Sequence, residues 1–97
     1  MAIAFDARYT GAGATRANYN EILSELGVAS GGTHPGSPAC LFHWMAEIPG
    51  GFRVTDVWDN QADFDKFIAD TVGPIAVRLN IPQPQVTPIP IHSFLRG

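Results

Sequence analysis

The stretch Phe52–Val72, FRVTDVWDNQADFDKFIADTV, decides the fold because a strand pattern in it runs directly into a helix pattern. Its first seven residues alternate between two faces, which is the period of a strand. One face carries Phe52, Val54 and Trp58, with the single carboxylate of Asp56 set among them. A half-buried strand with one polar group on its apolar face is therefore expected here.

The helix that follows has its own start signal. Asn60 is a good N-cap, and Asp63 stands three residues later, close to the spacing of a capping box. Behind them, four apolar side chains recur at helical spacing: Phe64, Phe67, Ile68 and Val72. The stretch thus predicts a strand–helix unit, and by itself it predicts no reaction.

Length and charge limit the class of protein. The chain has 97 residues, which predicts a single domain over 1–97, and a core this small is commonly extended by pairing with a second copy. The net charge is −3 and Lys and Arg form no run, which argues against a nucleic-acid partner.

No stretch approaches the roughly 20 apolar residues of a membrane span. Because Asp6 and Arg8 interrupt the apolar N-terminus, it reads as a strand rather than a signal peptide, and a cytoplasmic protein is expected.

The cysteine and histidine content argues against a metal site. Cys40 is the single cysteine, so an internal disulfide and a thiolate-rich zinc site are excluded. Cys40 itself reads as a small buried hydrophobe, with a reactive thiol as the alternative. The three histidines show no metal-ligand spacing, and His34 falls in a loop rich in Gly and Pro over 28–38. We expect no metal.

The remaining elements follow from periodicity and from turn residues. Strands are predicted over 2–9, 39–48, 52–58 and 85–95. A helix with the inner stripe Tyr19, Ile22, Leu23 and Leu26 is expected between a Thr15 cap and a Gly27 stop. The second helix is expected to be interrupted at Gly73-Pro74, with Pro74 in the first turn of a continuation to 79.

This order of elements predicts an α+β fold of the ferredoxin-like, split β-α-β-β-α-β type. In this fold a four-stranded antiparallel sheet carries two helices on one face, the first and third strands are central, and the second and fourth are edges. Pro88 and Pro90 agree, because both lack an N–H on the same side of the last strand and a proline is tolerated only at an edge.

The Pro49-Gly50 turn suggests how a polar pair forms in the sheet. If these two residues close a hairpin, His43 lies opposite Asp56, Leu41 opposite Trp58, and Met45 opposite Val54. Facing side chains lie about 5 Å apart, within reach of a hydrogen bond, although a bulge at Gly51 would shift the register. The pair is either a base oriented by a carboxylate or a buried polar pair that satisfies itself and sets the register.

Two further residues are candidates for the same site. Trp58 is either a core aromatic or the wall of a ligand pocket. His92, near the chain end, could reach that pocket or simply cap the sheet edge. The sequence leaves both alternatives open.

The chain resembles the dimeric α/β-barrel superfamily, which includes antibiotic-biosynthesis-type monooxygenases. The resemblance covers nearly the whole chain and rests on VTDVWDNQADFDKF (54–67), on the element order and on the terminal IPIHSF (89–94). It implies a homodimer whose two sheets face each other as a barrel, with pockets between each sheet and its helices. Some members oxidise aromatic polyketides without a cofactor, some degrade haem and some isomerise lactones.

Haem-degrading relatives use a histidine on the second helix, and residues 61–79 contain none, so no cofactor is expected. Two hypotheses remain. In the first, the protein binds a small apolar or cyclic molecule and is a cofactor-independent monooxygenase or isomerase; His43 and Asp56 are catalytic, and Trp58 and His92 bind the ligand. In the second, it is a non-catalytic dimeric module. A cavity beside His43 would favour the first hypothesis.

Overall fold

The computed structural model describes residues 2–27 and 40–93. The predicted loop over 28–38, with His34, lies outside the described residues. The described elements, in chain order, are β1 (Ile3–Thr10), α1 (Arg16–Leu26), β2 (Cys40–Ile48), β3 (Gly51–Trp58), α2 (Gln61–Phe67), the π-helical segment η1 (Ile68–Val72), α3 (Gly73–Arg78) and β4 (Gln85–Pro90).

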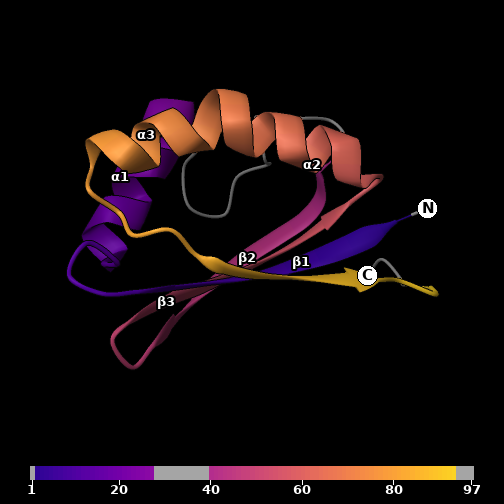
Figure 1. The fold of residues 1–97 in the computed structure, drawn as a ribbon, viewed down its shortest axis with the longest axis horizontal. Coiled ribbons are helices and arrows are strands. Elements are labelled where there is room, and N and C mark those ends of the chain that lie inside the picture. The colour runs from indigo at the N-terminus through magenta and orange to yellow at the C-terminus, as the bar shows by residue number, and fades with distance from the viewer. Residues whose placement is uncertain (1, 28–39, 94–97) are drawn as a thin grey trace.

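The four strands form one antiparallel sheet in the order β2-β3-β1-β4. Figure 1 shows α1 and the helical run α2–η1–α3 on the same face of this sheet. None of the described helices covers the opposite face, which is called the bare face below. The predicted topology, with β1 and β3 central and β2 and β4 at the edges, is confirmed. Of the helices in the described ranges, none has the length and apolar character needed to cross a membrane.

The β2–β3 hairpin has the register that the turn predicts. Ile48 pairs with Gly51 across the turn, and Gly50 adopts a φ of 78°, which a type II turn requires at its second central position and which glycine adopts without strain. His43 faces Asp56, as predicted, and Met45 faces Val54.

One predicted pair is wrong. Leu41 does not face Trp58, because the register shifts between Cys40 and Phe42 and Cys40 takes that place. Such a shift is a bulge, in which one strand carries an extra residue that has no direct partner. The bulge lies beyond His43, at the far end of β2 from the turn, so the His43–Asp56 register is unaffected.

Both helix starts are capped as predicted. The Oγ1 of Thr15 accepts from the N–H of Asn18 at 3.2 Å, and the Oδ1 of Asn60 accepts from the N–H of Asp63 at 2.9 Å. At the end of α1, Gly27 has a φ of 77°. These caps satisfy backbone groups that the helix cannot pair internally, each contributing about 1 kcal/mol.

The second helix passes through Gly73-Pro74 instead of being interrupted there. Its π-helical turn brings the N–H of Gly73 to the carbonyl of Ile68, five residues back, and α3 then begins with Pro74 in its first turn. A Cβ on Gly73 would lie 2.7 Å from that carbonyl oxygen. The wider turn therefore accommodates both a proline, which has no N–H to donate, and a close backbone contact.

Strand β4 is an edge strand, as predicted, but it ends at Pro90 rather than at 95. Just beyond the ends of the two strands, the N–H of Ile91 donates to the carbonyl of Ala2, at 3.3 Å. Residues 94 and 95 lie outside the described residues.

The core lies between the sheet and its helices and consists of two clusters. The first holds Phe5, Trp58, Phe64 and Phe67; the second holds Ala14, Tyr19, Phe52 and Val54. Trp58 and Phe52 are almost completely buried, at 0% and 1% exposed. Burying side chains of this size stabilises a fold by roughly 1.5–3 kcal/mol each.

Candidate active site

The strand pair β2–β3 holds the His43–Asp56 pair on the helix-covered face. The Nδ1 of His43 is hydrogen-bonded to the Oδ1 of Asp56. The predicted contact between the two side chains is therefore present. Alternation along each strand turns both side chains inward, and Asp56 is the one charged residue of the described core.

A third residue joins the pair from α1. The hydroxyl of Tyr19 lies 2.6 Å from the Nε2 of His43, and the two rings are parallel within 3°. Tyr19 was predicted only as part of the inner stripe of its helix. Thr15, which caps α1, places Tyr19 one turn later on the buried side, where it packs with Phe52.

Chemistry assigns the direction of both hydrogen bonds. An ionised carboxylate only accepts, so the Nδ1–H of His43 donates to Asp56. In a neutral imidazole the other nitrogen then accepts, so the Tyr19 hydroxyl donates to Nε2. The result is a continuous hydroxyl–imidazole–carboxylate chain that links a helix to two strands.

Burial and the charge of Asp56 act on the acidic groups around it. Burial, and then the negative charge of Asp56, raise the pKa of Tyr19 to about 12. The same two causes raise the pKa of Tyr9 and that of the Cys40 thiol to about 12. Each of these groups is therefore protonated at neutral pH, and Tyr19 remains a hydrogen-bond donor. For Cys40, this agrees with the inert rather than the reactive alternative.

The pair retains limited access to solvent. The side chains of His43 and Asp56 are 21% and 12% exposed.

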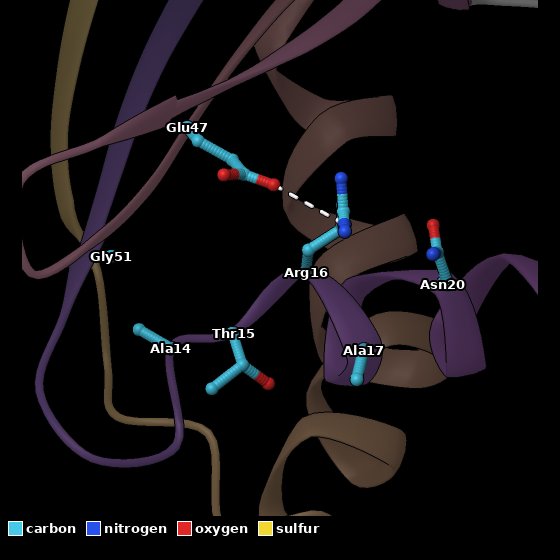
Figure 2. Close-up of a pocket in the computed structure, with 7 residues that line it drawn as sticks. All are labelled: Ala14, Thr15, Arg16, Ala17, Asn20, Glu47 and Gly51. Carbon is cyan, nitrogen blue, oxygen red and sulfur yellow. Dashed lines mark ion pairs between the residues drawn. The ribbon is translucent and has the colours of Figure 1, made fainter.

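An open depression of about 540 Å³ adjoins the same seam between α1 and β2, lined by Arg16, Asn20 and Glu47 among others. In Figure 2, Arg16 and Glu47 face each other across it, joined by an ion pair of 3.3 Å. Glu47 and His43 point to the same face of β2. They are four residues apart, which is about 13 Å along a strand. The depression therefore lies further along the same seam and does not include His43.

Trp58 shares the inner face of β3 with Asp56, two residues further along the strand, whereas His92 lies beyond β4, the strand at the other edge of the sheet. Trp58 packs against Phe64 and Phe67 in the aromatic cluster, which is the core alternative of the prediction. His92 is exposed, two residues beyond β4, at the sheet edge opposite β2. Ligand binding by Trp58 and His92 stays a prediction.

No cluster of three or more His, Cys, Asp or Glu suited to a metal ion occurs within residues 2–27 and 40–93. The hydrogen bonds described above build the candidate site from one carboxylate, one imidazole and one phenol. Such groups hold and move protons.

No family model matches the sequence, and no curated protein matches it either. Solved structures do match. Rv0793 from Mycobacterium tuberculosis superposes with a TM-score of 0.69 at 12% identity, covering 99% of this chain and 100% of its own. SnoaB, a cofactor-independent oxygenase from Streptomyces nogalater, gives 0.62 at 16% identity over 99% and 98%. MhuD, solved with manganese protoporphyrin IX, gives 0.55 at 12% identity over the full length of both chains.

At these identities the likeness concerns the fold alone. The resemblance seen in the sequence is borne out at that level: this chain has the ferredoxin-like fold of the antibiotic-biosynthesis-monooxygenase-like proteins.

Proposed function

We propose that the protein binds a small apolar cyclic molecule and removes a proton from a weakly acidic hydroxyl or C–H group of it. His43 is the base and Asp56 its orienting partner. The observation that carries this proposal is the hydrogen bond from the Nδ1–H of His43 to the Asp56 carboxylate. The carboxylate fixes the tautomer and stabilises the imidazolium that forms when Nε2 takes a proton.

Proton removal leads to either of two reactions. An isomerase returns the proton to another atom of the same substrate. A cofactor-independent monooxygenase lets the substrate anion react with O₂, so that a methylene group becomes a carbonyl group and one water is released. The description of SnoaB as a cofactor-independent oxygenase supports the second reaction.

The common first step can be tested without knowing the final product. Anthrone, an apolar tricyclic ketone with an acidic methylene, serves as the probe. In D₂O without oxygen, the wild-type protein is expected to accelerate exchange of the methylene protons, followed by NMR. His43→Gln should lose roughly 10²–10⁴-fold of that acceleration. An equal rate in the two proteins would overturn the proposal.

The homodimer, which both hypotheses share, has an observation of its own. The bare sheet face exposes Phe42 at 60%, Trp44 at 39% and Ile89 at 47%. Aromatic and Arg side chains are enriched at interfaces, and Arg53 lies over the Trp44 ring at 5.7 Å. We propose that a second copy covers this face. The homodimer is compatible with either function.

Light scattering at micromolar concentration tests the assembly. A dimer is expected, and Phe42→Asp should convert it to a monomer, because a buried charge at an interface centre costs several kcal/mol. Val77→Asp is the matched control, since Val77 is 77% exposed on α3, away from the sheet. A monomeric wild-type protein would contradict the homodimer.

A further inference from the structure

The Nε2 of His43, the atom that would take the proton, is already occupied by the hydroxyl of Tyr19 at 2.6 Å. Tyr19 is only 9% exposed and packs against Phe52 and Ala14 in a core cluster. Its ring packs against Phe52, at 5.5 Å between centroids, and its hydroxyl is held by the imidazole of His43. A side chain held in this way is a fixed member of the site.

We propose that Tyr19 is the catalytic residue that contacts the substrate, and that it forms with His43 and Asp56 a hydroxyl–imidazole–carboxylate triad. This inference rests on the proposed function and assigns the substrate contact within it to a phenol instead of an imidazole.

The geometry allows one proton to be relayed along this chain. A phenol oxygen that donates its hydrogen still has lone pairs that accept another. The acidic X–H of the substrate donates to the Tyr19 oxygen, Tyr19 passes its own proton to Nε2, and the substrate keeps the X–H electron pair as an anion. The imidazolium that forms is balanced by the Asp56 carboxylate, and Tyr19 ends the step as a neutral phenol.

The order of the hydrogen bonds supports the same assignment. The Nε2 of His43 is held by the Tyr19 hydroxyl and its Nδ1 by Asp56, so the hydroxyl is the end of the hydrogen-bonded chain.

Tyr9 provides an internal control for the test. Burial and Asp56 raise the pKa of both tyrosines to about 12, so a difference in their reactivity does not come from acidity. Tyr9 is partly exposed whereas Tyr19 is buried, so accessibility alone favours Tyr9. Arg16 lies between them, and trypsin therefore places them on separate peptides.

Benzenesulfonyl fluoride is the probe. A phenol oxygen forms a bond to sulfur, the sulfur–fluorine bond breaks, fluoride leaves and the phenolic proton goes to His43. At pH 7.5, mass spectrometry is expected to show Tyr19 modified at least roughly tenfold faster than Tyr9, because a positioned base accelerates such attack. His43→Gln should remove that advantage with the Tyr9 rate unchanged. Asp56→Asn should remove it as well, measured as the ratio of the Tyr19 rate to the Tyr9 rate, because loss of the Asp56 charge lowers the pKa of both tyrosines. Equal labelling of both tyrosines, or an advantage that survives both substitutions, overturns the triad.

The anthrone exchange separates this inference from the proposed function. Tyr19→Phe keeps the ring and deletes the hydroxyl, and it should lose the acceleration as fully as His43→Gln. If Tyr19→Phe keeps the wild-type rate while His43→Gln loses it, His43 contacts the substrate itself; the inference fails and the proposed function stands. If the wild-type protein accelerates nothing, the proposed function fails for this probe, and the labelling still decides whether the triad exists.

Discussion

Two carboxylates of equal burial lie on opposite faces of the same sheet and have different partners. The Asp56 side chain, 12% exposed on the helix-covered face, binds an imidazole that itself binds a phenol. The Asp6 side chain, 13% exposed on the bare face, binds the Nε of Arg53 at 2.6 Å and accepts from the Oγ1 of Thr55 at 3.3 Å. Arg keeps its charge at all relevant pH values, so the Asp6 cluster is a fixed ion pair. The Asp56 chain consists of groups that can exchange protons, and this difference is why the proposed chemistry is assigned to the helix-covered face.

The largest expected effect contrasts two tryptophans on these faces. Trp58→Ala, in the aromatic cluster, should lower the free energy of unfolding by about 3–5 kcal/mol, because it leaves a cavity that the core only partly fills. Trp44→Ala, at 39% exposed, should cost well under half of that in the monomer. Urea unfolding of both variants in the Phe42→Asp background, which is expected to be monomeric, measures the difference. Equal losses in that background would mean that the two faces are equally buried within one chain, and the contrast would fail.

The two carboxylates themselves provide the second contrast. Asp56→Ala leaves a buried imidazole N–H without its acceptor and should destabilise the protein by about 1–3 kcal/mol. In the milder Asp56→Asn variant, the amide can donate to Nδ1 and so select the wrong imidazole tautomer. Nitrogen-15 NMR of the His43 ring is expected to report an Nδ1–H tautomer in the wild type and its loss in Asp56→Asn.

Asp6→Asn is the matched control for this experiment. It removes the same charge from the opposite face, so the His43 ring spectrum and the anthrone exchange should remain as in the wild type. A change in the His43 tautomer on Asp6→Asn would show that the two faces are coupled, and the contrast would fail.

Alkaline pH gives a smaller effect with a defined direction. Burial and the Asp56 charge raise the pKa of Cys40 from 9.0, and those of Tyr9 and Tyr19 from 10.0, to about 12 in the folded protein. Folding therefore favours the protonated forms. Their contribution to stability is complete below about pH 9 and is lost as the pH rises towards 12.

Denaturant midpoints measured from pH 8 to pH 12 check this expectation. Cys40→Ala should flatten the first part of the decline, between pH 9 and 10, and the Tyr19→Phe and Tyr9→Phe variants should flatten the later part. Asp6→Asn, on the bare face, should leave the shape of the curve unchanged. A decline that is already steep between pH 8 and pH 9, or one that no variant alters, would contradict the assignment.

The smallest expected effect is the absence of haem binding. Added haem should produce no Soret shift that survives gel filtration, because the run α2–η1–α3 offers no histidine as an axial ligand. MhuD, which shares the fold, was solved with a manganese porphyrin and makes this a direct test of how far the likeness extends. A stable shift that disappears on changing His43 or His92 would contradict the prediction.

Local rules in the sequence determined the strand–helix units and the central polar pair. Period-two alternation placed His43 and Asp56 on the inner faces of their strands, and the Pro49-Gly50 turn aligned them, because a two-residue hairpin allows one register. The caps at Thr15 and Asn60 were also predictable, since a cap depends on residues only three positions apart.

Tertiary structure alone decided the rest. Periodicity placed Tyr19 on the inner stripe of its helix, but which strand residue it meets depends on how α1 packs across the sheet, and no local spacing encodes that contact. The bulge near Leu41 and the π-helical turn before Gly73 were not predicted either, because alternation and helical spacing assume regular elements and do not show where a strand takes an extra residue or a helix widens instead of breaking. The sequence by itself therefore determined an imidazole–carboxylate pair, and only the fold extended it to a phenol.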